Sequence, residues 1–136
     1  MTRVYNWIEQ LQGAFEAAAK KPFDYGLYNC GLFAAECIDA MTGSERAAEL
    51  KTQFNDEASA LEFVKRYGSI KAAVSARLGE PSDRWVDARR GDVCLMPTPW
   101  GPGLGICVGV QVAMMAPDSG LTHMKIDKIV AVWRID

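Results

Sequence analysis

The sequence is poor in the residues that build metal and cofactor sites. Its 136 residues include one histidine, His123, and no Cys-x-x-Cys pair. Zinc and iron–sulfur sites usually take closely spaced Cys or His ligands, so we expect no metal and no cofactor. A site formed by all four cysteines together is a formal alternative. Scattered thiols of this kind are typical of structural cysteines in a reducing compartment; they are Cys30, Cys37, Cys94 and Cys107.

The chain also lacks long apolar runs and runs of one charge. No apolar stretch approaches the roughly 20 residues of a membrane span, and the N-terminal segment MTRVYNWIEQ has no signal-peptide core. The formal net charge is −2, from 15 basic and 17 acidic residues, and no lysine or arginine cluster could grip a phosphate backbone. We therefore expect synthesis in a cytoplasm, no membrane span and no nucleic-acid partner.

Helical periodicity dominates the first 80 positions. Apolar residues recur at three-and-four spacing in segments bounded by capping residues and glycines. This spacing predicts helices over about 7–18, 30–41, 56–67 and 70–78, with SERAAELKTQF as a polar, partly helical surface connection. Each helix has one apolar face, so these segments are expected to pack on a common core.

From Trp85 onward, short runs of β-forming residues alternate with Gly, Pro and Asp. They predict strands near 92–97, 104–110, 111–116, 121–126 and 129–135, with PTPWGPG as a rigid, exposed connection between the first two. Helices followed by an antiparallel five-stranded sheet indicate an α+β fold. The length, with 49% hydrophobic residues, fits a single domain over residues 1–136.

Cys30 is the candidate catalytic residue because it lies where a loop is expected to become a helix, in FDYGLYNCGLFAAECIDAMTG. Backbone N–H groups at a helix start would face its sulfur and lower the pKa of the thiol. Such a thiolate is the nucleophile of cysteine enzymes. Free cysteine is equally a common core residue, so a buried structural thiol is the competing interpretation.

The order of motifs resembles the NlpC-type cysteine peptidases, papain-like bacterial and phage enzymes that cut peptidoglycan stem peptides. The resemblance rests on short segments along nearly the whole chain, namely Tyr25-Gly26, Asn29-Cys30-Gly31, Arg90-Gly91-Asp92-Val93, Gly103-Leu104-Gly105-Ile106-Cys107-Val108-Gly109 and the final IVAVWRI. It implies a papain-like fold with Cys30 at the nucleophile position. It also implies that Gly103 stands in place of the catalytic histidine and Met115 near the group that should orient it.

A narrower resemblance concerns the Phe-x-x-Gly-x-x-x-Cys segment at 23–30, the AMTG helix exit and the C-terminal VWRI. These resemble a small uncharacterised family encoded in phages and prophages among tail genes. The resemblance implies synthesis in a bacterial cytoplasm, location in the virion tail and other phage tail proteins as partners.

Four further residues have two interpretations each. His123 is a base for Cys30 if the sheet register differs from that of the family, and otherwise an ordinary surface histidine. Asp92 orients a base or, as we prefer, forms the turn that begins a strand. Tyr25 lines an active-site groove or fills core volume. Trp100, flanked by prolines, contacts a partner or folds back onto the domain.

Two functions of different class follow. The preferred hypothesis is a structural phage tail protein, at the tail tip or in tail assembly, with a degenerate and inactive NlpC-type peptidase fold. The alternative is an active cysteine endopeptidase or amidase that opens peptidoglycan during infection, with Cys30 as nucleophile and His123 as base. A host-encoded, prophage-derived domain with a regulatory partner is a third hypothesis.

Overall fold

The computed structural model describes residues 2–26 and 28–135. Five α-helices precede the sheet: α1 (Trp7–Ala19), α2 (Cys30–Thr42), α3 (Arg46–Lys51), α4 (Glu57–Tyr67) and α5 (Ile70–Leu78). Five strands follow: β1 (Val93–Thr98), β2 (Gly101–Cys107), β3 (Gln111–Ala116), β4 (Gly120–Lys125) and β5 (Ala131–Trp133). Of two 3₁₀ turns, η1 (Trp85–Asp87) precedes β1 and η2 (Ile126–Lys128) lies between β4 and β5. The predicted α+β order is confirmed.

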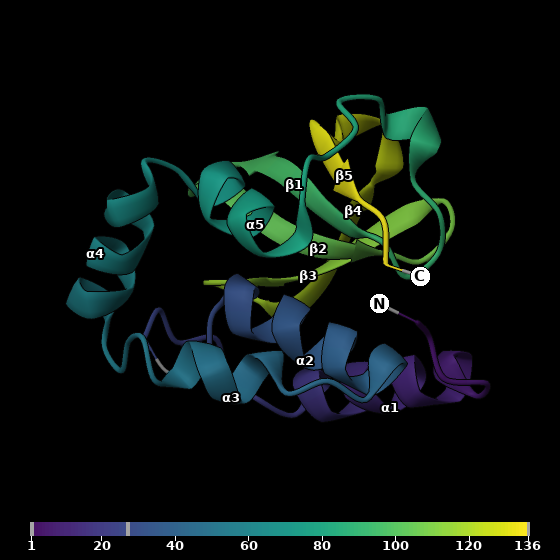
Figure 1. The fold of residues 1–136 in the computed structure, drawn as a ribbon, viewed down its shortest axis with the longest axis horizontal. Helices are drawn as coiled ribbons and strands as arrows, with labels where there is room; N and C mark the ends of the chain where they lie inside the picture. Colours follow the sequence, from purple (N-terminus) through teal and green to yellow (C-terminus); the bar gives the residue numbers. More distant parts are fainter. Residues whose placement is uncertain (1, 27, 136) are drawn as a thin grey trace.

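The strands form one antiparallel sheet in the order β4-β3-β2-β1-β5. Helices α1 and α2 lie along one face of this sheet, and α4 stands at the left end of the molecule (Figure 1). The main core lies between the sheet and these helices, and a smaller cluster around Cys94 and Cys107 occupies the other face beside η1 and η2. The alternating side chains of β1 and β2 therefore serve two separate cores.

Local capping explains where three of the helices begin. Side-chain oxygens of Asn29, Asp56 and Ser69 accept backbone N–H groups in the first turns of α2, α4 and α5. These are the residue types that N-caps favour. The α4 start is also held from outside, because a Cβ on Gly26 would lie 2.2 Å from the Cα of Asp56. A glycine is needed there for the loop before α2 to pack on α4.

The polar connection contains α3, whose first N–H groups are capped by a side chain of α2. One Asp39 carboxylate accepts the N–H groups of Arg46 and Ala47 at 2.8 and 2.9 Å. Asp39 lies in the last turn of α2, so α2 and α3 are joined through this side chain. The expected helical content of this segment is confirmed.

The segment PTPWGPG is largely exposed, as predicted, but most of it is strand, so the prediction of a loop is wrong. The β1–β2 ladder continues to Thr98 and Gly101, with Pro97 opposite Pro102. These prolines lie beyond the residues that pair with β3 and β5, so their missing N–H groups leave no central ladder incomplete. The hairpin therefore projects from the sheet with Trp100 at its tip.

Asp92 joins the two ends of the chain to the start of β1. Its carboxylate accepts the N–H groups of Arg89 at 2.9 Å and Ile135 at 3.1 Å, and lies 3.3 Å from the Arg3 guanidinium. Arg3 also donates to the carbonyls of Arg90 and Ile135. Figure 1 shows the two termini side by side at this point. The carboxylate thus has a structural role at the turn that opens β1.

The four cysteines are free thiols, and Cys37, Cys94 and Cys107 are buried. Among the described residues, no helix has both the length and the apolar character needed to cross a bilayer.

Candidate functional site around Cys30

Cys30 is the first residue of α2, as the sequence predicts. Asn29 fixes this position, because its Oδ1 accepts the Leu32 N–H at 3.0 Å while its Nδ2 donates to the Tyr25 carbonyl at 2.7 Å. One side chain thus ends the preceding loop and begins the helix. The Cys30 side chain is half-buried and packs against the main core.

The pKa of the Cys30 thiol differs from the expectation. Burial raises it above its usual range, although the backbone N–H groups of Leu104, Cys30 and Gly31 oppose that rise. The N–H groups at the helix start act in the predicted direction, but the predicted low pKa is wrong because desolvation outweighs them. At neutral pH the sulfur is a protonated thiol and a poor nucleophile.

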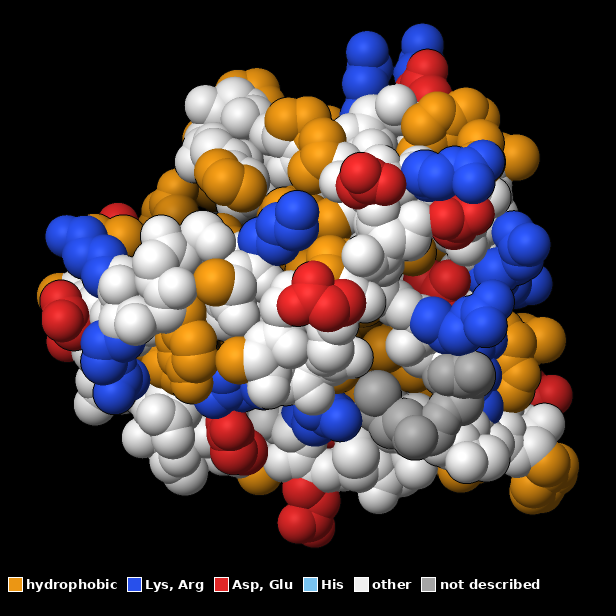
Figure 2. Space-filling view, turned by 45° about the horizontal axis from the view of Figure 1, so that its top comes forward, with side chains coloured by type: hydrophobic (Ala, Val, Ile, Leu, Met, Phe, Trp, Pro, Cys, Tyr) orange, Lys and Arg blue, Asp and Glu red, His pale blue; other side chains and the backbone are white. Residues whose placement is uncertain are grey.

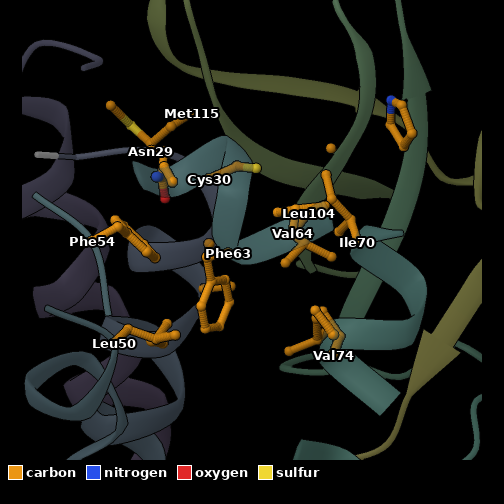
Figure 3. A pocket seen from close by; sticks show the side chains of 18 of the residues that line it. Asn29, Cys30, Leu50, Phe54, Phe63, Val64, Ile70, Val74, Leu104 and Met115 are labelled. Atoms are coloured by element: carbon orange, nitrogen blue, oxygen red, sulfur yellow. The ribbon is translucent and has the colours of Figure 1, made fainter. Parts of the chain in front are cut away.

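Cys30 lines a cavity of about 730 Å³. The floor comes from the start of α2 and the facing strands, and the walls come from α3, α4, α5 and the β1–β2 hairpin. Figure 3 shows the Cys30 sulfur turned toward Leu104, with Phe54 and Phe63 below it. Apolar side chains dominate the interior; they include Leu50, Phe54, Val64, Ile70, Val74, Leu104 and Met115.

Tyr25 and Trp100 line the same cavity. Tyr25 is 45% exposed, and its ring meets Phe23 edge-on at 4.8 Å. Trp100 is 47% exposed at the hairpin tip, where its backbone N–H donates to Thr98 Oγ1 at 3.1 Å. The fold therefore brings three of the candidate residues together, with the two aromatic side chains partly open to solvent.

His123 is not brought to this group. It is exposed on β4, the strand at the sheet edge, and pairs with Ala113 of β3. Strand β3 therefore separates it from β2, and His123 does not line the cavity that contains Cys30. Within the described residues, no hydrogen bond joins the imidazole to the thiol.

The strand position that faces the thiol is Leu104, rather than Gly103. A Cβ on Gly103 would lie 2.8 Å from Met114 Cε, and Met114 belongs to the cluster on the far face of the sheet. Leu104 belongs to the main core, against which Cys30 packs. Because strand side chains alternate between faces, a histidine at 103 would point away from the sulfur. Neither position supplies an imidazole.

Met115 lies on the same face as Leu104 and is 1% exposed. It lines the cavity, so the region where a base and its supporting group would stand holds two aliphatic side chains. The α4–α5 wall was missed from sequence as part of the site. The sequence did contain a sign of this wall, because Val64, Ile70 and Val74 are apolar residues of α4 and α5. In the structure these three side chains are only partly buried.

The rest of the described surface offers little other chemistry. No group of three or more His, Cys, Asp or Glu side chains in residues 2–26 and 28–135 is placed to hold a metal ion. Basic and acidic side chains are interspersed on the face shown in Figure 2.

A known protein family matches nearly the whole chain. The profile described as "Domain of unknown function (DUF6950)" matches residues 2–135. No curated protein matches the sequence.

Proposed function

The chain belongs to the DUF6950 family, and on that premise we propose that it is a non-catalytic module with an NlpC-type, papain-like fold. It serves as a structural protein of a phage tail, at the tail tip or in tail assembly. It is synthesised in the bacterial cytoplasm and carried in the virion, where it contacts other tail proteins. The observation that carries the absence of catalysis is a thiol at the start of α2 whose cavity contains no imidazole.

Cysteine proteolysis requires a base that takes the thiol proton and later returns it to the leaving amine. Here the side chains that face Cys30 from the sheet are Leu104 and Met115, neither of which titrates. Burial also raises the pKa of the thiol. These features support a fold that has kept the place of the nucleophile without the means to activate it.

A surface role is supported by the aromatic residues at the cavity. Tyr25 and Trp100 are both close to half exposed, on the loop before α2 and on the projecting hairpin. Tyr and Trp are enriched among the residues that dominate protein–protein binding energy. We assign them as contacts for a partner chain. Tail location is tested by mass spectrometry of purified virions, where the proposal expects this chain and its absence would contradict the tail assignment.

The absence of catalysis is tested with purified peptidoglycan. The wild-type protein and Cys30→Ala are incubated with it, and released peptides are measured by mass spectrometry. The proposal expects no release above background from either protein. Release by wild type that Cys30→Ala abolishes would overturn it.

An active peptidoglycan endopeptidase or amidase is the second candidate. The observation in its favour is the set of N–H groups from Leu104, Cys30 and Gly31 directed at the sulfur, because such groups stabilise a thiolate. In that case His123 would have to act as the base after a rearrangement of β4. Loss of peptidoglycan cleavage in His123→Ala would support this candidate, and unchanged background in all variants would remove it.

A further inference from the structure

The cavity around Cys30 has the dimensions of a ligand site. Its volume of about 730 Å³ lies within the range of roughly 300–1,000 Å³ that small-molecule sites occupy. It is bounded by α2, α3, α4, α5, the facing strands and the tip of the β1–β2 hairpin. It is thus a concave space inside the fold, distinct from a flat surface patch.

The wall formed by α4 and α5 is incompletely covered by protein. Val64 of α4, and Ile70 and Val74 of α5, line the cavity and are only partly buried. Figure 3 shows Val64, Ile70 and Val74 across the cavity from Leu50 and Phe54. Such side chains gain free energy when an apolar molecule displaces the water beside them. A flexible aliphatic chain fits a lining of this kind better than a rigid polar ligand, because methionine and aliphatic side chains adapt to it.

The polar groups of the cavity narrow the class of ligand. Its charged lining residues are two arginines, Arg46 and Arg77, and three glutamates, Glu45, Glu49 and Glu57. Arg77 pairs with Glu49 at 3.0 Å, so the lining has no excess of positive charge. A carboxylate or phosphate head would meet more acidic than basic groups. This charge balance favours an uncharged ligand.

Arg77 brings a buried hydrogen-bond donor to the lining of the cavity. The buried Nε–H of Arg77 makes no hydrogen bond within the described residues, while its terminal nitrogens donate to Tyr67 Oη at 3.3 Å and Glu49 Oε1 at 3.0 Å. A buried donor without an acceptor costs free energy. A ligand oxygen that accepts this N–H would remove that cost.

We propose that the cavity binds an uncharged aliphatic chain that ends in a hydroxyl or ester oxygen, with the chain against the α4–α5 wall and the oxygen near Arg77. The inference deepens the proposed function and rests on it in one respect, because a cavity without a catalytic base leaves its ligand chemically unchanged. It concerns binding by this chain alone and does not require a tail partner.

The test measures the binding of 1-decanol to the full chain by isothermal titration calorimetry, with decanoate and decylamine as matched charged probes. We expect saturable one-to-one binding of decanol, and weaker binding of both charged probes. Shortening the probe to 1-octanol should weaken binding about tenfold, since two buried methylenes are lost. Absence of saturable decanol binding, or tighter binding of decanoate, would overturn the proposal.

Filling the cavity supplies the matched mutational control. Val74→Trp places a large ring on the cavity wall and should weaken decanol binding by about tenfold or more. Val86→Trp makes the same change on the exposed η1 turn outside the cavity and should leave binding unchanged. Circular dichroism checks that each variant folds, and Val64→Phe replaces Val74→Trp if the latter does not. Equal binding by the filled variant and wild type contradicts the assignment.

The role of Arg77 is tested separately from its ion pair. Arg77→Met should weaken decanol binding about fivefold, because the Nε–H that donates to the ligand oxygen is lost with the guanidinium. Glu49→Gln removes the charge partner and keeps the Nε–H, so it should bind decanol like wild type. Equal losses in both variants would contradict the head-group contact.

Failures of the two proposals are distinguishable. Peptidoglycan cleavage by wild type would overturn the non-catalytic function and leave decanol binding to be judged by calorimetry. Loss of decanol binding would overturn the ligand assignment and leave the peptidoglycan result untouched.

Discussion

Asp92 and Cys30 both lie where a loop becomes regular structure, and burial raises the pKa of both side chains. Their surroundings differ in polar partners. The Asp92 carboxylate accepts two backbone N–H groups and faces Arg3, whereas Cys30 meets backbone N–H groups on one side and apolar side chains on the other. The fold thus concentrates its polar contacts where the termini meet β1 and leaves the cavity largely apolar.

The comparison shows how far each group depends on its neighbours. A buried carboxylate is costly without hydrogen-bond donors, so Asp92 needs both backbone N–H groups and the Arg3 guanidinium. A thiol is a weak donor that tolerates apolar surroundings while it remains protonated. Asp92 is therefore expected to matter for stability, and Cys30 to matter little for either stability or chemistry.

The largest loss in the free energy of unfolding is expected from Asp92→Ala, which removes the buried carboxylate. It leaves the Ile135 and Arg89 N–H groups without their acceptor and removes the carboxylate that faces Arg3. Breaking a buried pair of this kind costs about 3–5 kcal/mol in the free energy of unfolding. Urea denaturation measures this loss, with Asp118→Ala on the exposed β3–β4 turn as the control. A loss equal to that of the control would contradict the structural role of Asp92.

High pH should destabilise the fold through its other buried thiols. Burial raises the pKa of Cys37 and Cys94, so both stay protonated in the folded chain after they would ionise in the unfolded one. Their stabilisation is complete below the ordinary thiol pKa of about 8.5 and is lost as pH rises toward the folded pKa. Each thiol should contribute a slope of about 1.4 kcal/mol per pH unit. Urea denaturation from pH 8 to 10 checks this. Replacing both thiols by alanine should reduce the slope, while Cys30 and Cys107, whose pKa values burial also raises, keep part of it.

Supplying a base should make Cys30 resemble a catalytic thiol. Leu104→His places an imidazole on the face toward the sulfur, whereas Gly103→His places it on the far face near Met114. We expect the first variant to raise the rate of Cys30 alkylation by iodoacetamide at pH 7 about tenfold, through partial thiolate formation. The second should react like wild type. Equal rates in the two variants would contradict the assignment of Leu104 to the sheet face toward the Cys30 sulfur.

The smallest effect is expected from Cys30→Ala. The side chain is half-buried and its cavity is already open, so the change in the free energy of unfolding should be about 1 kcal/mol or less. Thermal or urea denaturation gives the value directly beside that of Asp92→Ala. A loss as large as that of Asp92→Ala would show that Cys30 is a core residue.

Short-range sequence patterns were enough to predict most of the fold. The helices and the α+β order follow from periodicity and from caps such as Asn29 and Ser69, which act within a few residues. The pairing of Pro97 with Pro102 was missed because proline has no N–H to donate to a neighbouring strand. It fits a strand only where no such neighbour pairs with it, and the strand order is not visible in the sequence.

The candidate site was predictable only in part. Cys30 was found from its place at a helix start, Trp100 from its proline-flanked segment, and Tyr25 from the resemblance to the NlpC-type peptidases. Leu104 was not, because its facing depends on the alternation of β2 relative to α2, where one residue of register reverses the direction of a side chain. The distance of His123 from the cavity likewise depends on the strand order.

The pH dependence of Cys30 alkylation tests the central claim most directly. Labelling by iodoacetamide is followed by mass spectrometry of the Cys30 peptide from pH 5 to 10. The account predicts a single rise that begins above the ordinary thiol pKa of about 8.5, unchanged in His123→Ala. A rapid plateau at neutral pH that His123→Ala abolishes would reveal a thiolate–imidazolium pair and contradict it.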